Sequence, residues 1–218
     1  MNVEKLQDPS EIIQEKLQEA SEKTTPSILA SVFTLATYDK ESGFPDCRNM
    51  VMQKFNQAET SFTFYTVESS DKAKQLTKHP FASLCFYWKP LQIQMRAQGI
   101  VVEVSEEEIE QAWSERSRSS QLFLLASRQG EIIETPQLLR NELDRLQEEN
   151  ENVEIFKRPK KWKGFKLVPK SVEFWFDRDR SIKNSVPLRI RFLRRLKQLK
   201  TQKARLAFGK WERKIVWP

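Results

Sequence analysis

The feature that most constrains the fold is a series of short apolar segments with the periodicity of β-strands. Segments 61–66 and 93–98 alternate polar and apolar residues, whereas segment 82–88 is almost continuously apolar. Alternation with a period of two is typical of a strand with one buried face, and a short continuous apolar run is typical of a strand buried on both faces. These segments therefore predict a sheet that covers a hydrophobic core.

A hairpin is expected before these strands, and further strands after them. Segment 30–38 is rich in β-branched and aromatic residues, 39–43 supplies Asp and Gly for a turn, and 46–55 forms the returning strand. Later strands are predicted at 165–168, 171–176 and 210–216. Six or more mostly antiparallel strands indicate an α+β barrel and not a parallel nucleotide-binding sheet.

Four helices are predicted around this sheet. Apolar residues at helical spacing predict the first over 11–23, and a capping serine precedes the second over 69–76. Ser105 and Glu108 have the spacing of a capping box, so a third helix is expected to about Arg116. The fourth covers 135–149, with a proline in its first turn. The expected fold is therefore α+β, a mostly antiparallel barrel with short peripheral helices.

The composition favours a folded protein that is retained in the cell. Of the 218 residues, 39% are hydrophobic and 11% aromatic, which is enough for a packed core. The two cysteines, Cys47 and Cys85, form no CxxC pair and no disulfide framework, which suits a reducing cytoplasm. The N-terminus has no cationic region followed by an apolar run, and no apolar stretch reaches about 18 residues. Neither a leader nor a membrane span is expected, and the predicted location is cytoplasmic.

The net charge of +7 arises in one tract. Eleven Lys or Arg residues and no acidic residue lie between 180 and 211, which leaves 26 basic against 30 acidic residues elsewhere. Within the tract, apolar and basic residues alternate over 188–200 and then shift toward helical spacing. We interpret it first as a solvated charged face or an irregular insertion. Contact with RNA or an acidic partner through 189–205, and attraction of a phosphate-bearing ligand, stay open as alternatives.

Familiar catalytic and phosphate-binding motifs are missing from the sequence. It contains no P-loop, GxGxxG or GxSxG pattern and no metal-ligand cluster, and five glycines are too few for a glycine-rich phosphate cradle. The single histidine, His79, precedes Pro80 at an expected helix end, where a surface position is more typical than a general base. A Ser-His-Asp triad and a metal site are therefore not expected, and a phosphate would be bound by side chains.

Short motifs between about Thr34 and Pro218 follow one another in a specific order, although each is weak alone. They are Leu35-Ala-Thr, Arg48-Asn-Met-Val, Phe64-Tyr-Thr, Ser70-Asp-Lys-Ala, the segment 84–94, the segment 116–121, Ala126-Ser-Arg-Gln, Trp162-Lys-Gly-Phe, Val172-Glu-Phe-Trp, Trp211 and Pro218. In this order and spacing, the motifs resemble the pyridoxamine 5'-phosphate oxidase family.

The resemblance implies a split-barrel homodimer that binds FMN at the subunit interface. The family oxidises pyridoxamine or pyridoxine 5'-phosphate, which are phosphorylated B6 vitamers, to pyridoxal 5'-phosphate, with oxygen as the electron acceptor. On this basis we divide the chain into an N-terminal helical arm, 1–28, and an FMN-binding split-barrel domain, 29–218. The family's dimerisation region corresponds to about 162–218. Neither a membrane nor a nucleic acid is an expected partner.

FMN combines a dianionic phosphate, a polar ring edge and a large apolar ring, so cationic, hydrogen-bonding and aromatic groups must converge on it. The resemblance implies that the phosphate is bound by Arg48 and Lys72, with backbone and hydroxyl contacts from Tyr65 and Thr66. It implies that the polar ring edge is bound by the amides of Gln94 and Gln129. Trp175 would then lie beside the ring, and Met50 and Val51 along it. For Tyr65 and Trp175, core packing stays an alternative, and for Gln94 a solvated strand face does.

The substrate-binding positions correspond to Gln53, Arg116 and Ser120, and only the last two match the family's residue types. Gln53 stands where the family has a lysine, and Ala112 stands where it has a substrate-phosphate tyrosine. Asp71 replaces a phosphate-binding arginine and would repel any anion that it faced. Gly130 occupies the position of an FMN-contact serine.

The largest departure from the family lies after Trp175. The family's RLHDR motif places Arg, His and a final Arg six, eight and ten residues further on, where this chain has Ser181, Lys183 and Ser185. In the family, the first two cover the substrate and assist its oxidation, and the last helps to hold FMN. Lys183 offers a charge, but neither an imidazole's proton transfer nor a guanidinium's fork. A nearby arginine substitutes if the register differs by a residue.

Three hypotheses about function follow. The first is an FMN-dependent oxidase of phosphorylated B6 vitamers or a related phosphorylated amine or alcohol. The second is a divergent paralogue that binds FMN or pyridoxal phosphate, or acts as a dimeric scaffold, with little or no oxidase turnover. The third is binding of nucleic acid or an acidic partner through 189–205. It is the weakest, because hardly any aromatic residue is interleaved with the basic residues there.

Overall fold

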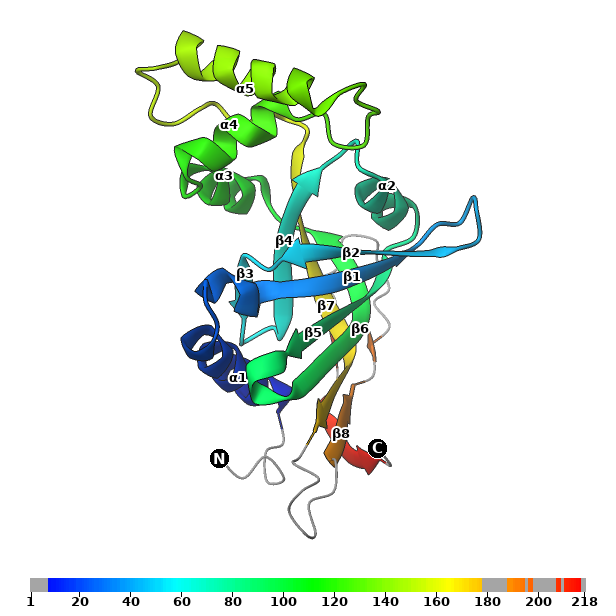
Figure 1. The fold of residues 1–218 in the computed structure, drawn as a ribbon. Helices are drawn as coiled ribbons and strands as arrows, with labels where there is room; N and C mark the ends of the chain where they lie inside the picture. Colours follow the sequence, from blue (N-terminus) through cyan, green and yellow to red (C-terminus); the bar gives the residue numbers. More distant parts are fainter. Residues whose placement is uncertain (1–7, 178–187, 195, 198–206, 209, 217–218) are drawn as a thin grey trace.

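The computed structural model describes residues 8–177, 188–194, 196–197, 207–208 and 210–216. In this part of the chain, antiparallel strands form a strongly curled sheet with helices packed around it (Figure 1). The predicted fold class, an α+β antiparallel split barrel, is confirmed.

The main sheet contains nine strands within the described residues. Seven follow the order β11-β8-β7-β6-β5-β1-β2, while β4 pairs with β7 and β3 pairs with β4. The strands of the sheet are β1 (Val32–Tyr38), β2 (Pro45–Val51), β3 (Lys54–Asn56), β4 (Ser61–Val67), β5 (Phe81–Trp88), β6 (Ile93–Glu103), β7 (Trp162–Phe176), β8 (Leu188–Leu193) and β11 (Glu212–Val216). A separate small pair is formed by β9 (Leu196–Lys197) and β10 (Ala207–Phe208).

Two strand predictions need correction. The segments 165–168 and 171–176 belong to one strand, β7, which continues past Pro169. Gln98 pairs with Ser171 and Gly99 with Pro169, so Lys170 is an extra residue in β7 and the register shifts there. A side chain at Gly99 would place its Cβ 2.2 Å from the Val168 carbonyl oxygen, so the close approach requires glycine. Conversely, the expected strand 46–55 is two strands, β2 and β3, separated by two residues.

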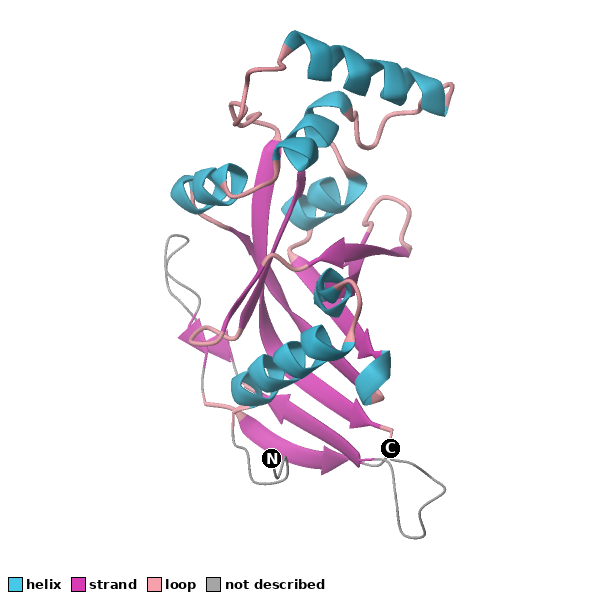
Figure 2. Cartoon of the chain, turned by 60° about the vertical axis from the view of Figure 1, so that its left-hand side comes forward, coloured by secondary structure: helices cyan, strands magenta, loops and turns pink. Residues whose placement is uncertain are grey.

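The four predicted helices are present, and a fifth was missed. The α-helices are α1 (Pro9–Lys23), α2 (Asp71–Lys78), α3 (Glu106–Ser114), α4 (Arg118–Ala126) and α5 (Pro136–Glu149), with 3-10 helices η2 (Ser27–Ser31) and η3 (Lys89–Leu91). Both sides of the predicted capping box between Ser105 and Glu108 are formed. The missed helix, α4, is capped by Ser117. The helices α3, α4 and α5 gather at one end of the sheet, and α1 lies toward the other (Figures 1 and 2). No helix in the described ranges is long and apolar enough to cross a bilayer.

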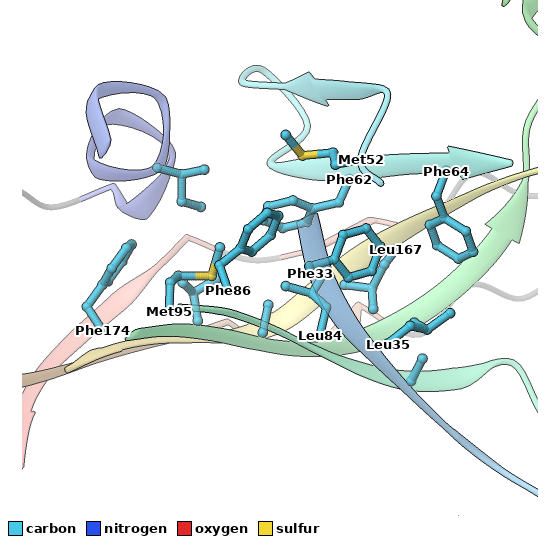
Figure 3. Close-up of a cluster of buried hydrophobic side chains, with 14 of the residues drawn as sticks. Phe33, Leu35, Met52, Phe62, Phe64, Leu84, Phe86, Met95, Leu167 and Phe174 are labelled. Carbon is cyan, nitrogen blue, oxygen red and sulfur yellow. The ribbon is translucent and has the colours of Figure 1, made fainter. Parts of the chain in front are cut away.

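The main core lies inside the curl of the sheet and is rich in phenylalanine (Figure 3). The rings of Phe33 and Phe64 meet edge to face with centroids 5.9 Å apart, and Phe33 also contacts Phe86 at 5.4 Å. From α1, Ile12 and Ile13 are completely buried in the same cluster. Alternation along β1, β5 and β6 buries one side of each strand, as predicted for 93–98. Two expectations are wrong: β4 is buried on both faces although 61–66 alternates in sequence, and β5 has one buried face although 82–88 is almost continuously apolar.

A second, smaller core ties α3 to the far ends of β4 and β7. Trp113 meets Trp162 edge to face with centroids 5.1 Å apart, and Tyr65 stacks on Trp162 at 4.6 Å. The completely buried Gln121 donates to the Trp113 carbonyl at 2.8 Å and accepts from the Phe156 amide at 2.9 Å. This side chain connects α3, α4 and the segment before β7.

Part of the basic tract forms regular structure. Residues 188–193 are strand β8, in which Ile190 and Phe192 are fully buried while Arg189 and Arg191 lie on the opposite face. An irregular insertion is therefore wrong for this segment, and a charged sheet face is confirmed there. Residues 178–187, 195 and 198–206 lie outside the described residues.

Candidate functional site

A cleft of about 310 Å³ opens between β2, the start of α2 and the loop after α4; we call it the α2 cleft. Four of the predicted cofactor residues line it: Arg48, Met50, Lys72 and Gln129. They come from segments that are distant in the sequence, so the fold brings them together. Asp71 and Gly130, two of the departures from the family pattern, also line the cleft.

Lys72 is the second residue of α2, and its side chain points into the protein: the residue is only 7% exposed. Burial, and then the nearby positive charge of Arg48, lower the pKa of its ammonium group. Its Nζ lies 3.5 Å from the Thr66 hydroxyl, and no carboxylate in the described ranges forms an ion pair with it. A buried cation in such surroundings is suited to binding an anion.

Arg48 lies on β2 opposite Leu35, so its side chain is on the inner face of the sheet. The guanidinium donates to the Thr37 hydroxyl at 2.5 Å and forms an ion pair with Asp46, and Gln75 of α2 lies 3.5 Å away. These contacts hold the guanidinium in one orientation beside Lys72. Asp46 and Asp71 also line the cleft, so its formal charges balance, and Lys72 is the buried cation with which no carboxylate in the described ranges forms an ion pair.

Hydrogen bonds join Gln129 to the start of α2. The Thr66 hydroxyl lies 3.1 Å from that of Ser70 and donates to the Gln129 side-chain oxygen at 3.5 Å, while the Ser69 hydroxyl donates to the Gln129 carbonyl at 3.1 Å. The next residue, Gly130, has φ +93°, and a Cβ there would lie 3.1 Å from the Ser69 carbonyl oxygen. Glycine at this position therefore has a local conformational reason.

Asp71 begins α2, where a carboxylate interacts favourably with the helix dipole. Its side chain is 72% exposed and lies 3.9 Å from Lys74, so solvent and a neighbouring cation weaken the repulsion that we expected toward an anion.

Tyr65 and Val51 do not line the cleft. The Tyr65 ring stacks in the second core, and its hydroxyl lies 3.5 Å from the Glu108 carbonyl, so core packing is confirmed for this side chain. Because side chains alternate along a strand, its neighbour Thr66 points the other way, toward the cleft. Val51 is half-buried at the end of β2, beside Val32 of β1.

Gln94 and Trp175 lie on the outer face of the sheet. They are direct cross-strand partners on β6 and β7, in a row that continues to Tyr87 on β5 and Arg189 on β8; we call these four residues the outer row. Their sequence neighbours Ile93 and Phe174 face the core, which puts the outer row on the opposite face from Arg48. Within one chain, the predicted cofactor residues therefore fall into two separate groups.

Beside the outer row, three arginines surround one carboxylate; Arg96, Glu173, Arg189 and Arg191 form what we call the Glu173 cluster. Arg96 donates to Glu173 at 2.7 Å, Arg189 at 2.8 Å and Arg191 at 2.7 Å. The Glu173 side chain is only 6% exposed. Burial opposes its ionisation, but the hydrogen bonds from the arginines outweigh this effect and lower its pKa to about 2.

The predicted substrate residues lie near the second core and not in the α2 cleft. The Arg116 guanidinium lies 5.3 Å from the centre of the Trp162 ring, and its buried Nε has no hydrogen-bond partner. Burial lowers the pKa of this guanidinium. Ser120 is in the first turn of α4, where its hydroxyl accepts from Ser117 at 2.8 Å. Gln53 is exposed between β2 and β3.

Other predictions have a simpler outcome. Ser181, Lys183 and Ser185 lie outside the described residues. His79 caps the C-terminal end of α2 beside Tyr38, as the helix-end position predicts. No group of metal-binding side chains occurs in the described ranges. Sequence reasoning missed Arg189, although the alternation of basic and apolar residues over 188–193 was the signal for a strand.

The fold defines the chain as a split-barrel protein of the kind found among FMN-binding proteins. Its structure is similar to PhzG from Burkholderia lata in complex with tetrahydrophenazine-1-carboxylic acid, with a TM-score of 0.78, 20% identity and coverage of 98% of this chain and 94% of that one. It is also similar to a pyridoxamine 5'-phosphate oxidase-related, FMN-binding protein from Nostoc punctiforme, with a TM-score of 0.67, 19% identity and coverage of 94% and 97%.

Residues 18–150 match the family model described as pyridoxamine 5'-phosphate oxidase. The chain is 34% identical over 172 residues to the pyridoxine/pyridoxamine 5'-phosphate oxidase of Pelagibacter ubique, covering 78% of this chain and 79% of that protein. It is 33% identical over 187 residues to the protein of the same name from Pseudomonas syringae, covering 84% of each. The chain belongs to the pyridoxamine 5'-phosphate oxidase family.

Proposed function

We propose that this protein is an FMN-dependent oxidase that converts pyridoxamine or pyridoxine 5'-phosphate to pyridoxal 5'-phosphate, with oxygen as the electron acceptor, in vitamin B6 metabolism. The observation that carries the proposal is Lys72, a buried ammonium group without an acidic partner, beside the fixed guanidinium of Arg48. A phosphate dianion complements this pair in charge and in hydrogen bonding. The unpaired Cys47 and Cys85 are consistent with a cytoplasmic enzyme.

The residues of the α2 cleft fit the phosphate end of FMN. Lys72 and Arg48 would neutralise the phosphate, Gln129 offers an amide and Met50 provides an apolar wall. The buried Thr66 hydroxyl contacts both Lys72 and Gln129 from behind the cleft. When bound, FMN supplies the group that accepts a hydride from the substrate carbon. The protein contributes by orienting both molecules and by compensating their charges.

The positions of the two groups of cofactor residues support a homodimer. The α2 cleft opens on the inner side of the sheet, whereas Gln94 and Trp175 lie on its outer face. Both groups meet at one flavin when a second copy places its outer row against the cleft of the first, so that each site contains residues of both chains.

Arg189 takes the role of the last arginine of the family's RLHDR motif. It lies directly across from Trp175 on β8, and Glu173 fixes its guanidinium at 2.8 Å. Counting ten residues along the sequence from Trp175 points to Ser185, which lies outside the described residues, whereas strand pairing points to Arg189. The next strand would then supply the cation that Ser185 lacks.

Arg116 and Ser120 are suited to the substrate's phosphate. The guanidinium of Arg116 is fixed over Trp162 and has a buried Nε without a partner, which a bound anion would satisfy. Ser120, in the first turn of α4, adds a hydroxyl close to a helix N-terminus.

A second candidate function is binding of FMN or pyridoxal phosphate, or a scaffold role, with little turnover. It is favoured by two substrate positions: Ala112 packs against the second core and has no polar side chain, and Gln53 lacks the family's positive charge. Both changes would weaken substrate binding more than cofactor binding.

One experiment separates these functions. The purified protein is mixed with FMN, its visible spectrum is recorded, and pyridoxamine 5'-phosphate is added without oxygen. The oxidase function predicts a perturbed flavin spectrum on mixing. It also predicts that addition of substrate bleaches the flavin absorbance at about 450 nm, because the substrate reduces the flavin. Binding without bleaching supports the second candidate, and no perturbation at any FMN concentration contradicts both flavin functions.

The role of Arg189 is tested with a matched pair of variants. Arg189→Gln and Arg191→Gln each remove a guanidinium that contacts Glu173, but only Arg189 belongs to the outer row. We expect Arg189→Gln to weaken FMN binding about tenfold and Arg191→Gln to change it less than threefold, since one charge-assisted contact contributes roughly 1.5 kcal/mol or more. Equal effects would show that Arg189 acts only through the stability of the cluster.

A further inference from the structure

We propose that Trp162 and Gln121 are positioning residues for Arg116, and that they determine how strongly the protein prefers a phosphorylated substrate. In the proposed oxidase function, on which this inference rests, Arg116 binds the phosphate of the substrate. Trp162 contacts the guanidinium of Arg116, and Gln121 contacts its backbone. Neither of the two is among the expected substrate-binding residues, so both act through Arg116.

The contact with Trp162 orients the guanidinium of Arg116 without using its hydrogen-bond donors. The guanidinium carbon lies 5.3 Å from the centre of the Trp162 ring. Such a cation–π contact attracts the positive charge to the ring and forms no hydrogen bond. The buried Nε of Arg116 accordingly has no hydrogen-bond partner. Trp162 therefore leaves the donors of Arg116 available to a phosphate, which a guanidinium binds in a bidentate manner.

The Glu173 cluster shows the alternative way to orient an arginine. There, Arg96 and Arg191 each donate from Nε to the Glu173 carboxylate at 2.7 Å. A carboxylate in the same position beside Arg116 would occupy the donors that a phosphate needs, and its charge would repel the phosphate. An aromatic ring holds the guanidinium and has neither effect, so it suits an arginine that must bind an anion.

The Trp162 ring is itself held in one position. It is 1% exposed, Tyr65 stacks on it with centroids 4.6 Å apart, and Trp113 meets it edge to face at 5.1 Å. Across the strands, Tyr65 pairs with Gly164, where a Cβ would lie 2.7 Å from a carbon of the Tyr65 ring. The glycine thus leaves room for Tyr65 to lie over β7 and to support Trp162. Arg116 therefore rests against a ring that cannot easily move.

Gln121 fixes the backbone of Arg116, which follows the end of α3. Its amide donates to the Trp113 carbonyl at 2.8 Å and to the Arg116 carbonyl at 3.4 Å, and its oxygen accepts from the Phe156 amide at 2.9 Å. The Gln121 side chain is fully buried, so breaking these bonds would leave polar groups without partners. Gln121 belongs to α4, which also carries Ser120, and so fixes the spacing between the two expected phosphate-binding residues.

Accurate placement of Arg116 matters more in this chain because two other substrate-binding positions have changed. Ala112 stands where the family has a substrate-phosphate tyrosine, and Gln53 stands where it has a lysine. Neither side chain can replace the lost hydroxyl or the lost charge. The preference for a phosphorylated substrate therefore depends on Arg116 and Ser120, and through them on the residues that hold Arg116 in place.

The test compares two probes that bind without turnover, 4-deoxypyridoxine 5'-phosphate and 4-deoxypyridoxine, which carry a methyl group in place of the oxidised one. Isothermal titration calorimetry on the full-length protein saturated with FMN gives two dissociation constants, and their ratio measures the preference for phosphate. We expect Trp162→Leu to reduce this preference about tenfold, and Trp162→Phe and Gln121→Leu about threefold. Trp88→Phe, which alters a buried tryptophan of the main core, is the matched control and should leave the preference unchanged.

A second arm repeats the measurement in Arg116→Gln protein and distinguishes positioning from a merely structural role. If Trp162 and Gln121 act through Arg116, Trp162→Phe and Gln121→Leu should change the preference less than about twofold in this background. A structural role would instead weaken both probes equally, or would persist without Arg116, and either result overturns the proposal. Trp162→Phe keeps a ring in the core and carries the test if Trp162→Leu does not fold.

The remaining outcomes separate the proposal from the oxidase function. A wild-type protein that binds both probes equally well overturns the proposal, because Arg116 then recognises no phosphate. An FMN-loaded protein whose flavin pyridoxamine 5'-phosphate does not reduce contradicts the oxidase function alone, since the probes report binding without oxidation. In that protein, the expected changes in the preference for phosphate would still support the positioning of Arg116 by Trp162 and Gln121.

Discussion

The α2 cleft and the Glu173 cluster both contain cationic side chains close together, but they differ in whether the buried charge has a partner of opposite sign. In the cleft, Lys72 is buried without an acidic partner, and its pKa is lowered. In the cluster, three arginines surround a buried carboxylate whose pKa is lowered to about 2. In the cluster, the buried charge is the Glu173 carboxylate, which three arginines stabilise, whereas the buried ammonium group of Lys72 has a cost of burial that an incoming anion would offset. Charge partners, more than charge density, distinguish a structural site from a binding site.

The largest expected effect is on folding stability. Replacing Glu173 by Gln removes the carboxylate and leaves three guanidinium groups close together, so we expect the free energy of unfolding to fall by about 3 kcal/mol. Urea denaturation at pH 7 measures the change. Glu103→Gln, at the exposed end of the neighbouring strand β6, is the control and should change it by less than about 0.5 kcal/mol. Equal losses in the two variants would contradict the structural role of the cluster.

The Glu173 cluster makes the folding stability depend on pH, in a direction that follows from the pKa of Glu173. The pKa of Glu173 is about 2 in the folded protein and 4.5 as its ordinary value, so the unfolded chain takes up the proton first as the pH falls. Its stabilisation is therefore complete above about pH 4.5 and is lost as the pH approaches 2. The stability difference between the wild type and Glu173→Gln should be constant from pH 7 to about pH 5 and then shrink. A difference that grows in acid would refute the assignment.

Removing the charge of Lys72 should affect folding stability in the opposite direction to removing that of Glu173. Because its buried ammonium group lacks an acidic partner, Lys72→Gln should leave the stability of the flavin-free protein unchanged or raise it by up to about 1 kcal/mol. The same variant should weaken FMN binding about 10- to 30-fold, as measured by quenching of flavin fluorescence. Lys74→Gln, on the exposed side of α2, is the matched control and should affect neither quantity much. Strong destabilisation by Lys72→Gln would show that the cleft is a paired structural site after all.

The smallest effect concerns the shape of the cleft. Gly130 and Gly43 both have positive φ, but only a Cβ at Gly130 would meet another atom, the Ser69 carbonyl oxygen at 3.1 Å. Gly43→Ala should cost about 1 kcal/mol from backbone strain alone. Gly130→Ala should cost a few tenths more and should also weaken FMN binding by about two- to fivefold, because the start of α2 must shift. Thermal unfolding and a flavin titration on both variants check this difference.

Local patterns predicted much of the fold. Alternation along 61–66 and 93–98 located β4 and β6, and the capping box at Ser105 located α3. Helix α4 was missed because its second half, Leu122 to Ala126, is apolar on nearly every side and has little periodicity. Strand β7 was divided in the prediction because Pro169 interrupts it, and the strand accommodates this proline beside a bulge of its own, in which Lys170 has no partner on β6. No local sequence pattern reports this bulge.

The candidate site was predictable residue by residue but not as an arrangement. Family motifs identified Arg48, Lys72 and Gln129, which the fold brings to one cleft. The pairing of Trp175 with Arg189 joins two segments that residues 178–187 separate in the sequence, so no local pattern reports it. Strand pairing is determined by the buried face of each strand and not by a count of residues.

The placement of cofactor residues on two faces of one sheet has a genetic consequence. A chain with Lys72→Gln and a chain with Arg189→Gln each form a defective site with their own copies. In a mixed dimer, however, one site receives both substitutions and the other receives neither. In the proposed homodimer, mixing the two variants and allowing the subunits to exchange should restore the FMN affinity of about a quarter of the sites. The two lesions would then complement each other although they lie in the same gene.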